Sequence, residues 1–273
     1  MKITRTFVLS GVALLALSGC SSATPQPEPS PSSSKISYAD GLHAKVLSVE
    51  TANTITVDVD GRTKEVRLLN VVAPTEHNNE FSGSCLVPES TEFLKQKLPE
   101  GTEVTLDFDD SRVGSSGYLE AAVYVGDDLI NADVVREGFA TTTFLSQRDE
   151  HYAPVSEAQQ EAAREGRGIY SKDVECSLPH AIQLHLDRVH RADDSQNEEE
   201  RVGLYKSASN FYNTLMSEAK SPDTWVGSIV TLDAVKDQLK ELKNALGKNY
   251  YDVQGKSERE KQSEANEPIR PGS

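Results

Sequence analysis

The sequence predicts an α+β protein, in which a five-stranded β-barrel with three helices is followed by a small all-helical region. Two observations carry this prediction. From residue 44 to about residue 172, short segments of alternating β-branched and polar residues are separated by turn signals such as Asp60-Gly61, which is typical of strands and hairpins. Beyond Cys176 the apolar residues recur every three or four positions, the spacing of amphipathic helices.

The order of the predicted elements favours a barrel of the OB type. The expected strands are Ala44–Val49, Thr54–Val59, Thr63–Val72, Thr102–Phe108 and Leu119–Val125. One helix, Pro88–Leu98, is expected between the third and fourth strands. Two more follow the fifth strand: Leu129–Phe139, and a helix that a capping box from Ser156 to Gln159 would open. Three strands, a helix and two strands suit an OB-type barrel, so we expect residues 41–175 to form one such domain.

Residues 176–252 predict a helical region. The apolar positions of its three segments are Leu178, Ile182, Leu186 and Val189; Leu204, Ala208, Phe211 and Leu215; and Leu232, Val235, Leu239, Leu242 and Leu246. The three helical segments could form either a small bundle or an arm that docks a protein partner. Trp225, Phe211, Tyr250 and Tyr251 are candidate anchors for a partner, although core packing explains the first two equally well. Residues 253–273 are polar and predict a disordered tail.

The first 19 residues predict a signal peptide. Lys2 and Arg5 precede an apolar stretch, residues 7–17, that is too short to span a bilayer. The sequence Leu17-Ser18-Gly19-Cys20 at its end resembles the lipobox of bacterial lipoproteins. This resemblance implies that Cys20 carries fatty acyl chains such as palmitate and anchors the chain to the extracytoplasmic face of a cell membrane. An ordinary signal peptide with an incidental cysteine is the alternative. Residues 20–40, rich in Ser and Pro, would then be a disordered tether.

The charge of the chain argues against a nucleic-acid partner. Without residues 1–19, 26 basic side chains stand against 43 acidic ones, a net charge of about −17. Proteins that bind nucleic acid through phosphate contacts normally present a basic face, and a negative long-range field repels polyanions. The same charge does not suit an anionic lipid surface, so a lipid would have to supply the anchoring.

Two cysteines, Cys85 and Cys176, remain beyond the predicted lipidation site. In an oxidising compartment, one disulfide is the simplest explanation of two cysteines. Free thiols stay open as an alternative, and a metal site is disfavoured because no second Cys/His cluster stands at ligand spacing.

Several runs of sequence, in order and without large gaps, resemble the thermonuclease (staphylococcal nuclease-like) family. The runs are Val49 to Glu76, with Val66-Arg67-Leu68-Leu69-Asn70-Val71-Val72-Ala73-Pro74 inside it, then Pro88 to Leu94, Leu129 to Ala140, and Glu161 to Ser171. Together they cover about residues 42–172. The resemblance implies the barrel fold. Because some extracellular members carry cysteines in similar places, it also implies a Cys85–Cys176 disulfide.

In an active member the resemblance implies a Ca²⁺-dependent phosphodiesterase, with metal carboxylates, a glutamate base and two phosphate-binding arginines. Arg67 matches the first arginine. The other four positions hold Asn53 and Val72 in place of the metal aspartates, Thr75 in place of the base, and Tyr118 in place of the second arginine. Removing a single transition-state donor commonly lowers the rate by ~10²–10³, so the combined changes predict negligible turnover.

Three hypotheses about function follow. The leading one is a lipid-anchored, non-catalytic binding or envelope-assembly module with no cofactor, which binds a protein partner through its helical region. The alternative is a Ca²⁺-dependent surface nuclease, in which Glu76, His77 or the cluster Asp107, Asp109 and Asp110 replaces the lost groups. A passive structural lipoprotein is the third.

Overall fold

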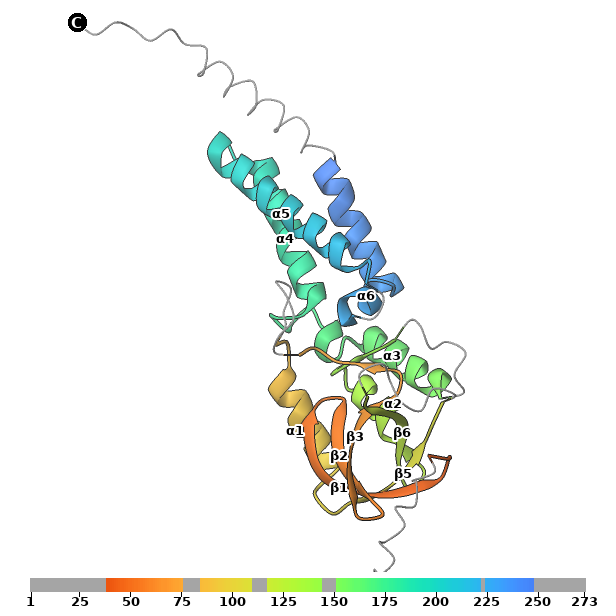
Figure 1. The fold of residues 1–273 in the computed structure, drawn as a ribbon. Coiled ribbons are helices and arrows are strands. Elements are labelled where there is room, and N and C mark those ends of the chain that lie inside the picture. Colours follow the sequence, from red (N-terminus) through yellow and green to blue (C-terminus); the bar gives the residue numbers. More distant parts are fainter. Residues whose placement is uncertain (1–37, 76–83, 110–116, 144–150, 222–223, 248–273) are drawn as a thin grey trace, which may run out of the picture. The chain divides into compact units, whose positions relative to one another are not determined.

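The computed structural model describes residues 38–75, 84–109, 117–143, 151–221 and 224–247 (Figure 1). The predicted signal peptide, Cys20 and the C-terminal tail lie outside these ranges, as do Glu76, His77, Asp110, Tyr250 and Tyr251. Among the described residues, no helix combines the length and the apolarity needed to cross a bilayer.

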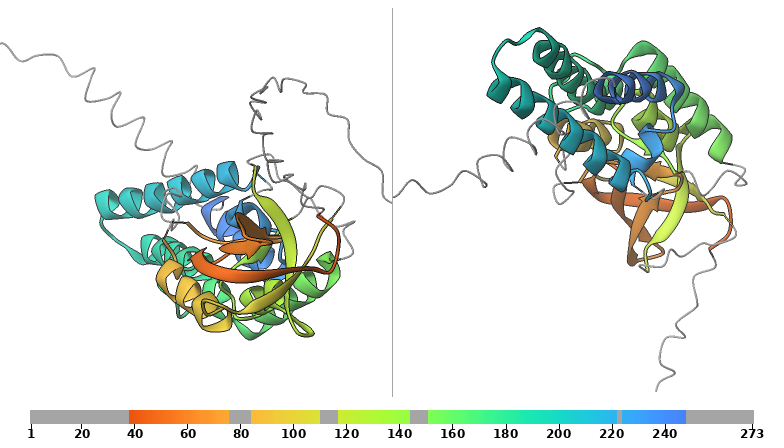
Figure 2. Two further views of the ribbon diagram at one scale, coloured as in Figure 1. Left: turned by 60° about the horizontal axis from the view of Figure 1, so that its bottom comes forward. Right: turned by 90° about the horizontal axis from the view of Figure 1, so that it is seen from above.

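Five strands close into a barrel, as predicted. They are β1 (Leu42–Thr51), β2 (Thr54–Val59), β3 (Arg62–Leu68), β5 (Glu103–Asp107) and β6 (Leu119–Val125). Neighbours in the order β3-β2-β1-β5-β6 pair antiparallel, and a parallel pairing of β3 with β6 closes the ring. The views in Figure 2 show the strands curving around a common centre. The two-residue strand β7 (Asp128–Leu129) pairs antiparallel with the end of β6.

A single buried asparagine secures the closure. Asn131 lies on α2 (Ile130–Arg136) and is 1% exposed. Its Nδ2 donates to the carbonyl oxygens of Leu69 (2.8 Å) and Ala121 (3.1 Å), and its Oδ1 accepts from the Val123 amide (2.8 Å). The side chain therefore joins the end of β3 to β6 by hydrogen bonds to three backbone groups, of which the Ala121 carbonyl also accepts from the Leu69 amide.

The predicted strand Thr63–Val72 is in fact two strands, so its single span is a wrong prediction. Asn70 has a left-handed backbone with φ of 63°, which asparagine tolerates better than most residues. Beyond it, β4 (Val71–Val72) pairs with β8 (Thr141–Thr142) instead of continuing in the barrel. The apolar pattern hid this break because the residues on both sides of it are buried.

The capping box at Ser156 is also a wrong prediction. The helix α3 (Tyr152–Glu165) begins four residues earlier, with Pro154 in its first turn, where no backbone N–H has to be satisfied within the helix. Gln159 therefore lies inside the helix, where its Oε1 accepts a hydrogen bond from the Thr142 amide. The helix α1 (Val87–Lys97) lies where it was predicted.

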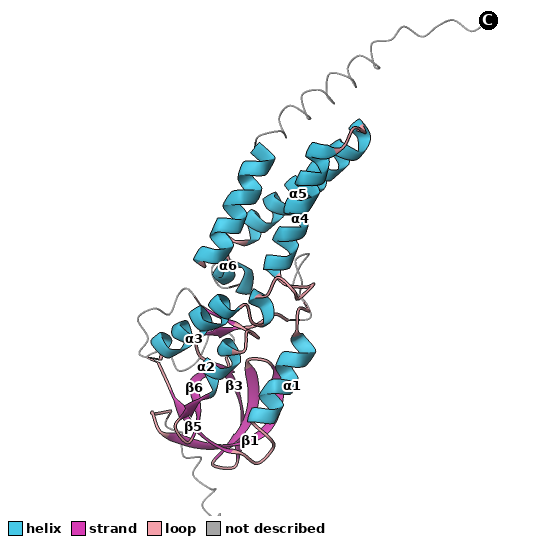
Figure 3. Cartoon of the chain, turned by 180° about the vertical axis from the view of Figure 1, so that it is seen from behind, coloured by secondary structure: helices cyan, strands magenta, loops and turns pink. Residues whose placement is uncertain are grey.

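Four helices follow the 3₁₀ turn η1 (Gly168–Tyr170): α4 (Leu178–Asp194), α5 (Glu198–Glu218), α6 (Trp225–Ile229) and a helix at residues 233–247. Figure 3 shows α4 and α5 running side by side. The predicted apolar periodicity is confirmed, because its residues are buried or partly buried. Trp225 and Phe211 belong to this core at 1% and 9% exposure, so of the two explanations left open for them the structure supports core packing.

The helical core continues into the part of the chain that precedes it. One apolar cluster joins residues of α4, α5, α6 and helix 233–247 to Ala162, Ile169 and Tyr170 of the preceding part. The Cys85–Cys176 disulfide is present beside it and confirms the predicted pairing, across a sequence separation of 91 residues. In the chain-entropy model a loop of that length stabilises the folded state by about 4–5 kcal/mol.

His185 fastens α4 to α5 in a way that depends on its protonation state. Its ring stacks on Phe211, with ring centroids 4.1 Å apart and an angle of 11° between the planes. Nη1 of Arg188 lies 3.3–3.4 Å from the two ring nitrogens and donates to Ser207 Oγ at 3.0 Å. Burial, and secondarily the nearby Arg188 charge, lower the pKa of His185 to about 4.

We predict that this histidine makes the fold sensitive to acid. Between pH 6.5 and about 4 the unfolded chain protonates His185 while the folded chain does not, so stability falls as the pH falls through that window. Urea unfolding of the His185→Phe variant should show a shallower loss than the wild type. Changing the exposed His190 to Phe is the matched control and should leave the profile unchanged. Parallel profiles for the wild type and His185→Phe would contradict the prediction.

Candidate functional site

Barrel closure brings together the residues that match the family's catalytic positions. Arg67 lies near the end of β3, where it pairs in register with Glu120 of β6. Tyr118 lies two residues before Glu120, so closure places it beside Arg67. Asn53 occupies the turn between β1 and β2, and the carbonyl of Asn53 accepts from the Leu68 amide at 2.8 Å.

The side chain of Asn53 helps to hold its own turn. Its Nδ2 donates to the carbonyl oxygen of Val71 at 3.1 Å. Its Oδ1 accepts from the hydroxyls of Thr51 (3.1 Å) and Thr54 (3.3 Å). The oxygen that could have faced a cation therefore already accepts two hydrogen bonds, and the amide ties the turn to β4. A carboxylate could not make the bond to Val71, since it has no donor.

Arg67 is held by an aromatic ring. Its Cζ lies 4.6 Å from the centroid of the Tyr118 ring, within the range of a cation–π contact worth ~0.5–2 kcal/mol. Among the described residues, no carboxylate forms an ion pair with Arg67, and its buried Nε has no hydrogen-bond partner. The guanidinium is therefore oriented but not neutralised.

Val72 and Thr75 supply no catalytic group. The side chain of Val72 is partly buried and packs against the apolar cluster of the helical core. An ionised carboxylate at that position would meet an apolar surface, which is strongly unfavourable without a partner. Thr75 is half-buried, and its hydroxyl is far too weak a base to replace a glutamate.

The acidic residues that could have replaced the lost ligands do not assemble a metal site in the described part of the chain. Asp107 instead accepts a hydrogen bond from the Gly41 amide at 2.7 Å, which fastens the start of β1. No group of three or more His, Cys, Asp or Glu side chains there is arranged to hold a metal ion. Glu76, His77 and Asp110 lie outside the described residues, so their part in the alternative stays a prediction.

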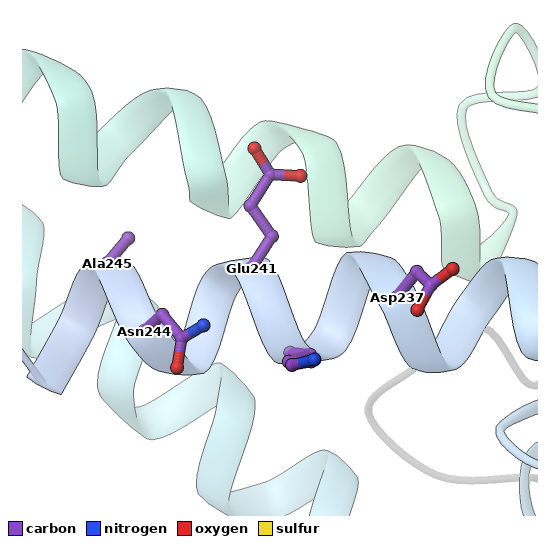
Figure 4. Close-up of a pocket in the computed structure, with 5 residues that line it drawn as sticks. Asp237, Glu241, Asn244 and Ala245 are labelled. Atoms are coloured by element: carbon purple, nitrogen blue, oxygen red, sulfur yellow. The ribbon is translucent and has the colours of Figure 1, made fainter.

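A cavity of about 430 Å³ lies along helix 233–247, far in sequence from Arg67. Its lining residues are Asp237, Lys240, Glu241, Asn244 and Ala245. Figure 4 shows Glu241 rising toward the neighbouring helix, while the labelled side chains point in different directions. Charges of both signs and the lack of convergence are typical of an ordinary helix surface.

Sequence reasoning treated Tyr118 only as a lost arginine and did not foresee its contact with Arg67. Tyr118 lies two residues before Glu120, which pairs with Arg67 across the parallel strands β3 and β6, and this spacing brings the Tyr118 ring next to Arg67. It could be used only once the register of β3 against β6 was known.

Comparison with known proteins agrees with this architecture. Residues 65–172 match the family model described as staphylococcal nuclease homologue. This range contains Arg67, Val72, Thr75 and Tyr118, and it begins after Asn53.

Two thermonucleases and one uncharacterized protein are among the similar proteins. The thermonuclease of Staphylococcus hyicus is 26% identical over 170 residues, which is 62% of this chain and 98% of the relative. That of Staphylococcus intermedius is 27% identical over 127 residues, or 46% of this chain and 75% of the relative. An uncharacterized protein of Bacillus anthracis is 27% identical over 139 residues, or 50% of this chain and 64% of the relative. Together with the barrel, these matches show that this part of the chain is similar to the staphylococcal nuclease family.

Proposed function

We propose that the chain is a membrane-anchored lipoprotein whose nuclease-like domain binds a protein partner at the cell envelope and does not hydrolyse nucleic acid. The anchor would be the lipid on Cys20, on the extracytoplasmic face of the membrane. The domain would need no cofactor, and a nucleic-acid partner is disfavoured by the formal net charge of −15.

The observation that carries the proposal is the reuse of the former catalytic positions. Asn53 bonds to Val71, Thr51 and Thr54, and Val72 packs on the helical core. The Asn53 carboxamide and the Val72 side chain thus stabilise the fold, and neither group is free to bind a metal ion. Calcium prefers six to eight oxygen ligands, several of them charged, and these positions offer none that is charged and free.

The helical region is the proposed place of contact with the partner. It adds residues 176–247 beyond the matched range, and it exposes Leu184 of α4 and Met216 of α5 at 43% and 38%. These two side chains replace Trp225 and Phe211 as candidate contacts, because the latter are buried in the core.

One observation favours the second candidate, a Ca²⁺-dependent surface nuclease with a rearranged site. Arg67 is oriented by Tyr118 and has no ion-pair partner among the described residues, so it could still receive a phosphate. Such an enzyme would have to draw its carboxylates from Glu76 or from other residues outside the described ranges.

The Asn53→Asp substitution tests whether this position now serves the fold. The carboxylate loses the donor to Val71 and faces that carbonyl oxygen, so the free energy of unfolding should drop by about 1–3 kcal/mol in urea titrations. Asn244→Asp adds the same charge at an exposed helix position and should change stability far less. An Asn53→Asp variant as stable as the wild type would contradict the structural role.

Activity itself is tested with single-stranded DNA and RNA as substrates, in the presence of calcium or of EDTA. We expect no calcium-dependent hydrolysis by the full-length protein, since the base and the charged metal ligands are missing. Calcium-dependent hydrolysis that disappears in Arg67→Ala but persists in Lys64→Ala, a matched change on the same strand, would overturn the proposal. Activity equal in all three proteins would be that of a contaminating nuclease and would leave the expected result standing.

A further inference from the structure

A second pocket, of about 280 Å³, lies between the end of α3, the 3₁₀ turn η1, the start of α4 and the first turns of helix 233–247. None of its lining residues belongs to a barrel strand, so it is distinct from the site described above. Its floor consists of the apolar lining residues Tyr170, Pro179, Leu232 and Val235. Covering such a floor with an apolar group of a ligand is favourable, because it removes apolar surface from water.

Two hydrogen bonds hold the wall of this pocket in place before any ligand arrives. Oη of Tyr170, a residue that is 5% exposed, donates to the carbonyl oxygen of Ala140 at 2.9 Å. The carbonyl oxygen of Lys172 accepts from Nδ1 of His180 on α4 at 2.8 Å. The segment between η1 and α4 is therefore fixed on both sides of the floor, and little ordering is left for a ligand to induce.

Two cations at the rim have no ion-pair partner among the described residues. Arg164 of α3 and Lys172 both line the pocket and are exposed, and neither takes part in any of the ion pairs found there. The acidic lining residue, Glu165, pairs with Arg167 and not with the adjacent Arg164. The rim therefore keeps an excess of positive charge in a chain whose formal net charge is −15.

This arrangement is complementary to an apolar side chain that stands next to a carboxylate. The guanidinium of Arg164 can bind both oxygens of a carboxylate, and the ammonium of Lys172 adds a second positive charge. The volume lies just below the ~300–1,000 Å³ of pockets that enclose a whole small molecule, which favours one side chain of a larger partner. An anchor in a pocket with polar contacts around it is typical of the residues that carry most of the binding energy of an interface.

We propose that the protein partner docks at this pocket, with an apolar side chain on the floor and a neighbouring carboxylate bound to Arg164 and Lys172. This inference rests on the proposed function, because it takes a protein partner as given and states where and through which chemistry it binds. Pro179, Leu232 and Val235 belong to the helical region, so the pocket lies at the region already proposed for the contact. The charge of the rim selects an acidic segment of the partner over a basic one.

The probe is the peptide acetyl-Leu-Glu-Glu-amide. Its matched counterparts are acetyl-Leu-Gln-Gln-amide, which lacks the charges, acetyl-Ala-Glu-Glu-amide, which lacks the anchor, and inorganic phosphate as a simple anion. In ¹⁵N–¹H spectra of the full-length protein in a non-ionic detergent, the probe should give saturable shifts of the Gly166, Tyr170 and Val235 amides. The two altered peptides should bind at least tenfold more weakly, and phosphate should give no saturable shift. Equal affinity for the three peptides, a saturable response to phosphate, or no saturable response to the probe would overturn the proposal.

Variants at the rim locate the binding without disturbing the floor. Arg164→Gln and Lys172→Gln should each weaken binding of the probe about tenfold through loss of a charge-assisted hydrogen bond. Ala234→Trp, at an exposed lining position, should cover the floor and abolish the shifts. Lys206→Gln, at an exposed position of α5 outside the pocket, is the matched control and should bind as the wild type does. Unchanged affinity in folded Arg164→Gln and Ala234→Trp proteins would contradict the assignment.

Failure of this docking site can be told apart from failure of the proposed function. The proposed function fails if the protein hydrolyses nucleic acid in a reaction that needs calcium and Arg67. A protein that lacks this hydrolysis and also fails to bind the probe peptide overturns the docking site alone.

Discussion

The parallel pairing of β3 with β6 is the constraint on which the rest of the barrel depends. Without it the sheet would be an open ribbon, and Arg67 would have no Tyr118 beside it. Asn131 holds this pairing from within by bonding to Leu69, Ala121 and Val123 at once. Replacing this side chain by an apolar one would remove three buried hydrogen bonds at once. The hydrogen bond from Asn131 to the Leu69 carbonyl also positions the end of β3, the turn at Asn70 and the start of β4.

The positions that match the family's catalytic residues take part in the bonding and packing of the fold. Asn53 ties its turn to β4, Val72 contacts the helical core, and Tyr118 supports Arg67. The helical region is bound to the same part of the chain by the continuous apolar cluster and by the Cys85–Cys176 disulfide. A restored aspartate at Val72 would therefore have to compete with packing against that core. This gives a physical reason why the changes at the site and the added helices belong together.

The sequence was sufficient for the elements that repeat a simple period. The barrel strands alternate, the helices of the C-terminal region repeat every three to four residues, and both patterns survive in the burial of their side chains. The sequence was insufficient where one residue changes the direction of the chain, as Asn70 does. It was also insufficient where a polar side chain forms a hydrogen bond with a residue far away in the sequence. Gln159 was expected to cap its helix, but it bonds to Thr142 on β8, which no local rule could indicate.

At the site, sequence matching proposed the positions but could not indicate the contacts that their side chains make. Trp225 was a candidate anchor because large aromatic side chains are common at interfaces, yet in a helical region of this size it is needed for the core. The contact of Arg67 with Tyr118 depends on strand register, which the composition of either strand does not reveal.

We propose that the barrel does not bind calcium. A calcium titration of the full-length protein, followed through the backbone amides of Asn53, Val72 and Thr75 in ¹⁵N–¹H spectra, tests it most directly. We predict no saturable shift of these amides, only the small and gradual changes that an acidic surface gives with any divalent cation, magnesium included. A saturable shift confined to these amides, produced by calcium and not by magnesium, would contradict the account and restore the domain as a metal-dependent enzyme.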